Sequence, residues 1–292
     1  MSNSSDTIHS AIDPADEPLG ESDLVNFCSE IVPKGAIYEM SVNEARFGLS
    51  RLLPILLLSD LGSFRMLEVG AGSCLLSAYL ASRGLCVTAL EPLGSEFDFL
   101  ADLQTRVIDF CRRRAIPLQL IRKSAEQLDL TSDFDVVFTI NALEHMRDPL
   151  GSIDNMYRAL KPGGTLLVHC PNYTIPLEVH FNILLITRSK TFNAWLYWSR
   201  IERYRDVWNE LNFIRYIDIR RHLEARKIPF KFSRSIARDL VLRLFSDPIF
   251  ARRMPTAVHT ACSMLSRLGL LSRLDLIPAR FQTPMEVAIK KM

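Results

Sequence analysis

The sequence predicts an α/β fold built on an open, mostly parallel β-sheet with helices on both faces. Short apolar strands alternate with helical stretches from Arg65 to about residue 173. Two glycines, Gly70 and Gly72, stand at the end of the first of these strands, and Glu91 ends the next strand. In an open parallel sheet the carboxyl ends of the strands form the edge where ligands bind. These observations therefore predict both the fold class and the place of a ligand site.

Each element is predicted from its own pattern along the chain. A helix is predicted over 43–57, where the apolar residues fall on one face. The alternating region has strands in "RMLEV", "LCVTALE", "PLQLIRK", "FDVVFTI" and "TLLVHC", and helices in "SCLLSAYLASR", "EFDFLADLQTRVIDFCRRR" and "PLGSIDNMYRALK". Pro162-Gly163-Gly164 is expected to end the last of these helices. After residue 173 the alternation stops, returns as a helix and a strand in "IDIRRHLEARKIPFKFSRS", and closes with the strand "TPMEVAIKK".

The composition is that of a globular chain, with 48% hydrophobic and 23% charged residues among 292. Residues 1–23 hold six acids and neither Lys nor Arg, which predicts a disordered acidic tail and not a secretory leader. The longest aliphatic run, at 52–61, contains a proline and is too short to span a bilayer. The six cysteines form no CxxC pair, which favours buried free thiols in a reducing cytoplasm.

The net charge of +2 hides an asymmetry between two parts of the chain. Residues 1–182 carry 14 basic and 24 acidic side chains, a net charge of −10. Residues 183–292 carry 21 basic and 9 acidic side chains, a net charge of +12. A basic half favours an anionic partner such as a lipid surface, a phosphate-bearing substrate or nucleic acid. The alternative is that it neutralises the acidic half within the same chain.

The residues around the glycines indicate the class of ligand. Glu91 follows Gly72 by 19 residues, and a carboxylate at that place accepts hydrogen bonds from both hydroxyls of a ribose. Leu75 stands where a dinucleotide-binding fingerprint has its third glycine, which disfavours a pyrophosphate and with it a nicotinamide-dependent reductase. Glu68 lies inside an apolar strand and needs a cationic or hydrogen-bonding partner, which a ligand ammonium group would supply.

Four sequence blocks resemble a known family. "LEVGAGSC" resembles the E/DxGxGxG signature of class I S-adenosylmethionine-dependent methyltransferases, and "VTALEP" resembles their ribose-binding acid after the second strand. "FDVVFTINALEHMRDP" and "ALKPGGTLLVHCPNY" are similar to the fourth- and fifth-strand segments of the branch that includes ubiquinone-biosynthesis O-methyltransferases. The resemblance covers 65–173, 217–235 and the last strand.

This resemblance implies a Rossmann-like sheet of seven strands in the order 3-2-1-4-5-7-6, with the last strand antiparallel. It implies one methyltransferase domain over 24–292, whose core lies at about 43–173, 217–236 and 283–292. The stretches 174–216 and 237–281 are then helical cap insertions on the ligand side. The implied cofactor is S-adenosyl-L-methionine.

The resemblance also assigns residues to the cofactor. The implied set is Glu68, Gly70, Ala71, Gly72, Glu91, Pro92, Ser124, Ala125 and Asn141. Ser124 stands where the family usually offers an acid to the adenine amino group, so Ala125 is expected to contribute through its backbone N–H. Asn141 is expected to approach the methionine portion of the cofactor, with a helix N-cap role as the alternative.

A methyl acceptor must lose a proton, and the candidates for assisting this step are acids and histidines near the ligand edge. His145 is the first candidate general base, because the matching Glu-His pair of the ubiquinone branch lies at the active site, and Glu144 would orient it. Glu178 and His180 are the secondary candidates, in the loop after the fifth strand. Glu144, His145, Glu178 and His180 have the chemistry of metal ligands, but one sequence cannot show that they converge, and we assign no metal.

The predicted function is transfer of a methyl group from S-adenosylmethionine to a small, hydrophobic or lipid-like acceptor, a reaction of class EC 2.1.1. Residues 181–216 hold nine aromatic side chains, among them all three tryptophans, which favours an apolar chamber in the cap. We expect a cytoplasmic enzyme, peripheral at an anionic membrane through its basic half and without a transmembrane segment. The alternatives are an RNA methyltransferase and a non-catalytic Rossmann-like binding module. A nucleic-acid partner is disfavoured, because "INAL" stands where a base-amino methyltransferase has an NPPY-like motif.

Overall fold

The computed structural model of the chain describes residues 19–56, 64–92, 98–254 and 256–292. Most of the predicted acidic tail, at 1–18, lies outside these residues. Its predicted boundary at residue 23 was wrong, because α1 (Glu21–Ile31) begins at Glu21. The acids at 21 and 23 lie in the first turn of this helix, where carboxylates interact favourably with the helix dipole.

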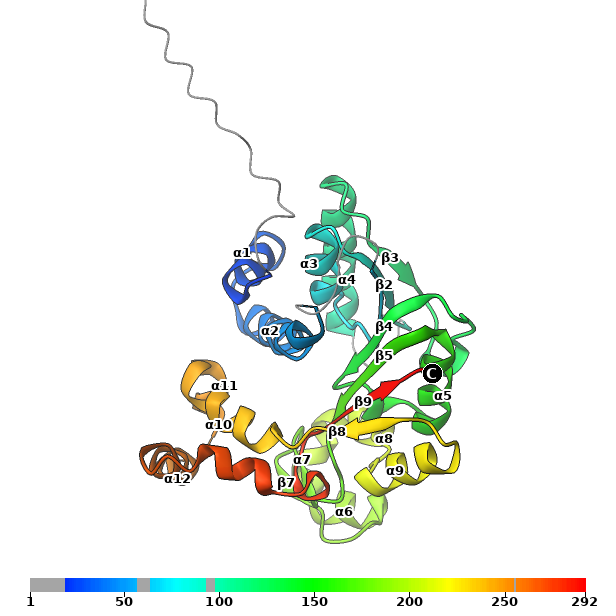
Figure 1. The fold of residues 1–292 in the computed structure, drawn as a ribbon. Helices are drawn as coiled ribbons and strands as arrows, with labels where there is room; N and C mark the ends of the chain where they lie inside the picture. The colour runs from blue at the N-terminus through cyan, green and yellow to red at the C-terminus, as the bar shows by residue number, and fades with distance from the viewer. Residues whose placement is uncertain (1–18, 57–63, 93–97, 255) are drawn as a thin grey trace, which may run out of the picture.

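The main sheet has seven strands in the order β3-β2-β1-β4-β5-β9-β8 (Figure 1). Its strands are β1 (Arg65–Val69), β2 (Cys86–Leu90), β3 (Gln119–Ile121), β4 (Phe134–Ile140), β5 (Leu160–Cys170), β8 (Phe230–Phe232) and β9 (Met285–Lys290). Numbered along the chain, this is the predicted order 3-2-1-4-5-7-6. The last strand, β9, pairs antiparallel with both β5 and β8, and the remaining pairs are parallel. The predicted fold class is confirmed.

Helices cover both faces of the sheet, and the strand residues alternate between the two faces. Helices α1, α2 (Ala36–Leu56), α3 (Leu75–Ser82) and α4 (Asp98–Arg113) cover one face, and α5 (Pro149–Ala159) and α9 (Tyr216–Ala225) cover the other (Figure 1). On β1, Met66 packs with the first group and Leu67 with the second. This period of two buries nearly every residue of the central strands, which explains their continuous apolar runs.

Two element boundaries differ from the prediction. Helix α2 starts at Ala36, seven residues before the predicted start, and packs against both α1 and α3. Helix α5 ends at Ala159, and the Pro-Gly-Gly that was expected to end it belongs to β5. The β4–β5 register shifts between Phe134 and Val136, so pairing of Phe134 with Leu160 extends the strand backward through the glycines.

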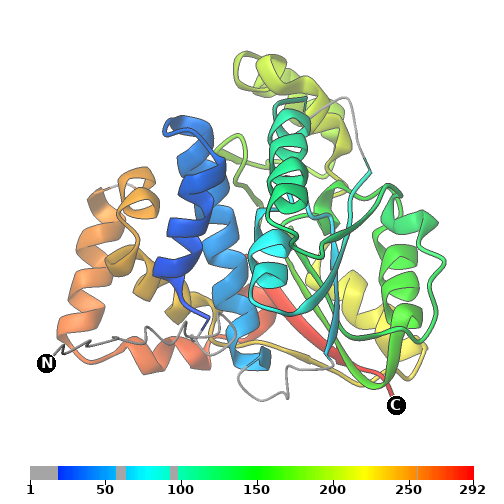
Figure 2. The same ribbon diagram turned by 90° about the horizontal axis from the view of Figure 1, so that it is seen from above.

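The predicted insertions form two further groups of elements. The first holds β6 (Leu177–Glu178), β7 (Ile183–Leu184), α6 (Lys190–Leu196), α7 (Trp198–Ile201), η5 (Glu202–Tyr204) and α8 (Arg205–Glu210). Its small core is Phe181, Ile183, Ile201, Trp208 and Leu211. The second holds α10 (Ile236–Ser246), α11 (Pro248–Arg253), α12 (Thr256–Arg267), η6 (Leu271–Leu276) and η7 (Ala279–Phe281). Its helix α10 lies next to α2, and α11 and α12 extend outward on the same side of the molecule (Figures 1 and 2).

A partly buried ion-pair network joins the second insertion to the core. Arg51 of α2 donates to Glu286 of β9 at 2.6 Å and to Asp239 of α10 at 2.9 Å. His169 of β5 lies 3.4 Å from the same Glu286 carboxylate. The network therefore joins α2, α10 and two strands of the sheet.

Among the described residues, no helix is long and apolar enough to cross a membrane. All six cysteines are free thiols, as predicted, and five of them are buried. Cys86, at the start of β2, is exposed and departs from the expected burial.

Candidate cofactor and acceptor site

The loop between β1 and α3 requires glycine at Gly70 for two separate reasons. Gly70 has φ +76° and Gly72 has φ +50°, both in the left-handed region. A Cβ on Gly70 would lie 2.4 Å from the Cβ of Ala142. The N–H groups of Gly70 and Ala71 donate to the carbonyl of Leu90 at 2.9 and 3.3 Å, which closes the loop over the end of β2.

The carboxylate of Glu91 faces this loop. Its Oε2 accepts a hydrogen bond from the N–H of Gly72 at 2.8 Å, and its own N–H donates to Ile121 at 3.0 Å. Burial raises the pKa of the Glu91 carboxyl to about 7, although the bond from Gly72 opposes this shift. Glu91 and the glycine loop are thus brought together as the sequence predicted. Pro92, the next predicted cofactor residue, is exposed just beyond them.

Glu68 lies on β1 with its carboxylate buried against α3, where the hydroxyl of Ser77 donates to it. Burial raises the pKa of Glu68 to about 8, and the charge of Glu91 adds to the rise. A carboxyl with this pKa is mostly neutral at pH 7 when no cation is bound. A cation that approached it would favour the ionised form.

Glu68→Gln is expected to make the protein less sensitive to rising pH. The folded pKa of Glu68 lies above its unfolded value of 4.5, so the native state binds more protons than the unfolded state between those pH values. Stability from this group is therefore lost as pH rises through the window. Between pH 5.5 and pH 8, the free energy of unfolding of the parent should fall by about 2–3 kcal/mol more than that of the variant. Urea denaturation at both pH values measures this, and parallel pH profiles would refute it.

The segment expected near the adenine forms η3 (Ala125–Gln127), with Ser124 as its N-cap. The N–H of Ser124 donates to the Gln127 side chain at 3.2 Å, and the Ser124 hydroxyl accepts a hydrogen bond from the backbone N–H of Gln127. Asn155 of α5 donates to the carbonyls of Ala125 and Glu126, each at 3.0 Å. These bonds hold the segment rigidly.

Asn141 follows β4 with φ +53°, and its N–H donates to the carbonyl of His169 at 2.8 Å. Its side chain is exposed. The next short helix, η4 (Leu143–His145), has Ala142 at its N-cap and no side-chain cap bond. The alternative N-cap role for Asn141 was therefore wrong, and the exposed amide remains available to a ligand.

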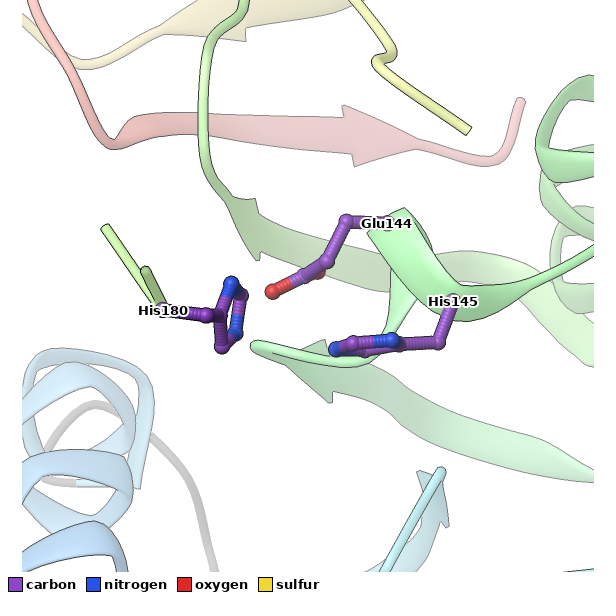
Figure 3. A group of neighbouring side chains, drawn as sticks. All are labelled: Glu144, His145 and His180. Atoms are coloured by element: carbon purple, nitrogen blue, oxygen red, sulfur yellow. The ribbon is translucent and has the colours of Figure 1, made fainter. Parts of the chain in front are cut away.

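Glu144, His145 and His180 meet in space (Figure 3). The first two lie on η4, and His180 follows β6 in the first insertion. One ligating atom from each side chain lies within 4.8 Å of those of the other two, and the two imidazole centroids are 5.3 Å apart. The primary and secondary catalytic candidates thus form one cluster.

The cluster contains groups with strongly shifted pKa values. Glu144 is fully buried, and neither of its carboxylate oxygens has a hydrogen-bond partner. Burial raises the pKa of Glu144 to about 7. Burial and the neighbouring His180 lower the pKa of His145 to about 4, so its imidazole is neutral at pH 7. Perturbed titratable groups gathered in one place are typical of functional sites.

Glu178 orients the imidazole of His180 through a hydrogen bond. Its Oε1 accepts a hydrogen bond from Nδ1 of His180 at 2.6 Å, and its Oε2 accepts from the N–H of Phe181 at 2.8 Å. The hydroxyl of Tyr173 donates to Oε1 at 3.2 Å. Burial opposes ionisation of both members of the pair, but their contact outweighs it, lowering the pKa of Glu178 and raising that of His180. The Glu178 oxygens are therefore already engaged, which makes it a positioning residue.

The sequence prediction missed Asn212, which fixes η4 from the first insertion. Its amide nitrogen donates to the carbonyls of Leu143 and Met146 at 2.7 and 2.8 Å, and its backbone N–H donates to the backbone carbonyl of Glu144 at 2.8 Å. No local pattern marks this asparagine, because its role depends on a segment more than sixty residues away.

One known family matches the part of the chain that contains most of these residues. Residues 67–166, which run from β1 into β5 and contain the glycine loop, Glu91 and η4, match a family described as a methyltransferase domain. The seven-stranded sheet has the order and the antiparallel last strand of that class. Residues 67–166 therefore form a methyltransferase domain of the class I, S-adenosylmethionine-dependent type. S-adenosylmethionine is accordingly the cofactor of this methyltransferase.

The methyltransferase is similar to several individual proteins. It is 29% identical over 261 residues to an uncharacterized protein of Mycobacterium tuberculosis, covering 85% of each chain. It is 28% identical over 116 residues to the ubiquinone biosynthesis O-methyltransferase of Rickettsia typhi, covering 40% of this chain and 44% of that relative. A solved structure of Haemonchus contortus phosphoethanolamine N-methyltransferase 2 with S-adenosyl-L-methionine matches 93% of this chain and 57% of that one, at 17% identity and a TM-score of 0.49.

Proposed function

We propose that this methyltransferase transfers the methyl group of S-adenosylmethionine to a small hydrophobic or lipid-like acceptor at the surface of an anionic membrane, as a cytoplasmic enzyme. Glu91 would hold the ribose hydroxyls, Glu68 the cofactor ammonium group, and the N–H of Ala125 the adenine. Asn141 would contact the methionine portion. Residues 174–216 and 237–281 would be the caps that enclose the acceptor.

The observation that carries this proposal is the pattern of exposure along 177–180. Glu178 is fully buried and accepts a hydrogen bond from His180, which joins the Glu144–His145 cluster. The neighbouring side chains of Leu177 and Val179 are exposed. The segment that completes the cluster therefore also presents apolar side chains to the outside.

The exposed apolar side chains extend well beyond this segment. We define the apolar cap surface as Leu177, Val179, Leu184, Ile186, Phe192, Trp195, Leu196 and Trp198, all of which are exposed. Trp195 is 71% exposed and Trp198 is 55% exposed. Exposed apolar side chains in such number favour an interaction surface, and tryptophan is the residue enriched at membrane–water interfaces.

The charge of the same segment favours an anionic lipid surface. Residues 183–216 contain six basic and three acidic side chains. The basic ones are Arg188, Lys190, Arg200, Arg203, Arg205 and Arg215. Cations beside exposed tryptophans add electrostatic attraction to apolar insertion. An acceptor dissolved in the membrane would then meet the enzyme at the cap that borders the cluster.

Methyl transfer itself is an in-line displacement at the sulfonium methyl group, so alignment of acceptor, methyl and sulfur supplies much of the rate. The acceptor would lose its proton next to the Glu144–His145–His180 cluster. These groups lie beyond the end of β4, at the carboxyl edge of the sheet that also holds the glycine loop.

The acceptor class is tested by incubating the protein and isotopically labelled S-adenosylmethionine with lipid extracts, small-molecule extracts and total RNA. We expect label in the organic phase, identified by mass spectrometry, and its loss in Glu91→Ala. Label found only in RNA would contradict this proposal and favour the RNA methyltransferase alternative. Failure of the protein to bind S-adenosylmethionine would favour a non-catalytic binding module.

Replacing Trp195 and Trp198 together with serine is expected to weaken binding to vesicles that contain phosphatidylglycerol by about tenfold or more. The change removes large apolar side chains from the exposed surface and leaves the cluster untouched. Vesicle co-sedimentation measures binding, with neutral phosphatidylcholine vesicles for comparison. Met292→Ser, an 81% exposed apolar residue at the C-terminus, is the matched control and should bind as the parent does. Equal binding by all three proteins would contradict the proposed membrane surface.

A further inference from the structure

Among the described residues, one group of side chains has the geometry of a metal site. Glu144, His145 and His180 each offer one ligating atom, and these atoms lie within 4.8 Å of one another (Figure 3). They come from two segments that are separated by more than thirty residues in sequence. We propose that Glu144, His145 and His180 bind a divalent transition-metal ion.

The donor set selects the class of ion. Two imidazole nitrogens and one carboxylate oxygen suit Zn²⁺ and its first-row neighbours. Mg²⁺ and Ca²⁺ prefer sites made of oxygen alone. Two histidines and one carboxylate as protein ligands also leave a coordination position open, which is the arrangement of catalytic and not of structural zinc sites.

The state of Glu144 is an independent indication of a ligand. Its side chain is fully buried, and both of its oxygens are without a hydrogen-bond partner. A buried carboxylate without partners costs free energy that proteins normally avoid. A metal ion in the space between Glu144 and the two imidazoles would supply the missing interaction.

The surroundings of His180 match those of a ligating histidine. Glu178 accepts the hydrogen bond from Nδ1 at 2.6 Å, which leaves Nε2 to act as the ligand. A carboxylate behind the ring in this way fixes the tautomer and orientation of metal-bound histidines. Glu178 is itself held by Tyr173 and by the N–H of Phe181. The imidazole of His180 is therefore oriented before any ion arrives.

The backbone that carries the other two ligands is also held in place. Asn212 donates two hydrogen bonds to the carbonyls on either side of them and one to the carbonyl of Glu144. Pre-oriented ligands reduce the cost of binding an ion. Both ligand-bearing segments are thus held by contacts within the first insertion or between it and the core.

The role of the ion rests on the proposed function. An acceptor hydroxyl that occupied the open position would have a lowered pKa. Its O–H bond would break with release of the proton to water, and the new O–CH₃ bond would form as the S–CH₃ bond of S-adenosylmethionine breaks. S-adenosylhomocysteine and the methylated acceptor are then the products, and no oxidant or reductant is needed.

The test uses the full chain after treatment with a chelator, with ZnCl₂ and CoCl₂ as probes. We expect one equivalent of Zn²⁺ to bind by calorimetry, and Co²⁺ to give a visible absorption band that Zn²⁺ displaces. His180→Ala and Glu144→Gln should abolish saturable binding. Glu178→Gln should weaken it by about tenfold, because carboxylates behind ligating histidines contribute 10–100-fold to metal affinity. His259→Ala, whose imidazole contacts the carbonyl of Ala251 in the second insertion, is the control and should bind as the parent does.

Binding of S-adenosylmethionine by each variant separates this proposal from the previous one. A His180→Ala variant that binds the cofactor normally but has lost the metal supports the site. No saturable Zn²⁺ binding by the parent protein, or equal binding by His180→Ala, overturns it. Metal binding together with an absence of lipid-like acceptors would retain the site and overturn the proposed acceptor instead.

Discussion

Glu91→Ala is expected to weaken the binding of S-adenosylmethionine by at least about 100-fold. A carboxylate that accepts hydrogen bonds from both ribose hydroxyls contributes about 1.5–3 kcal/mol for each bond. Loss of both corresponds to two to four orders of magnitude in affinity. The variant also loses the hydrogen bond from the N–H of Gly72 that closes the glycine loop in the free protein.

Isothermal titration calorimetry with S-adenosylmethionine measures this effect, and thermal denaturation excludes misfolding. Burial raises the pKa of Glu91 to about 7, so above that pH the alanine variant is relieved of the cost of ionising a buried carboxyl. This gain opposes the loss of the hydrogen bond from Gly72, so the variant should still unfold in one cooperative transition, as the parent does. Asp129→Ala removes an exposed acid paired with Lys123 and should bind the cofactor normally. Unchanged affinity in Glu91→Ala would remove this residue from the cofactor site.

Gly70→Ala is expected to lower the free energy of unfolding by roughly 3 kcal/mol or more. The new Cβ would be 2.4 Å from the Cβ of Ala142, and the residue would have to keep φ +76°. The backbone strain alone accounts for about 1 kcal/mol. The remainder arises because the loop and the end of β4 must move apart.

Gly84→Ala is the matched control, since Gly84 has φ +82° and nothing lies within 4 Å of a Cβ built there. The loss of stability in Gly84→Ala therefore measures the backbone strain without the steric clash. The double variant Gly70→Ala/Ala142→Gly removes the colliding methyl group and should recover part of the loss seen in Gly70→Ala. Urea denaturation measures all three proteins. If Gly70→Ala is no less stable than Gly84→Ala, the close approach of the loop to Ala142 is not a constraint on the fold.

Much of the cofactor half of the molecule was predictable because its determinants are local. The strand β1, the glycine turn, α3 and β2 follow one another within thirty residues, and Glu91 ends the series. Each of these features has its own pattern of apolar residues or of backbone freedom. The structure brings Glu91 to the N–H of Gly72 as that pattern requires.

The candidate acceptor site was less predictable because its determinants are distant from one another. The sequence marked Glu144, His145, Glu178 and His180 as candidates but could not show that they converge. Their meeting depends on how the segment of His180 packs against η4 and on Asn212, which has no local signal. The β4–β5 pairing that absorbed the Pro-Gly-Gly segment into a strand is likewise a contact between separate parts of the chain.

By itself the sequence determined the class of fold, the methyl donor and the position of the glycine loop after β1, because hydrophobic periodicity and glycine freedom are properties of neighbouring residues. Only the tertiary structure decided that Glu144, His145 and His180 form one cluster and that Glu178 orients His180. It also decided that the outer side of the same segment exposes an apolar surface. The physical reason is that burial, side-chain contact and pKa depend on distances in space, and these arise when segments far apart in the chain pack together.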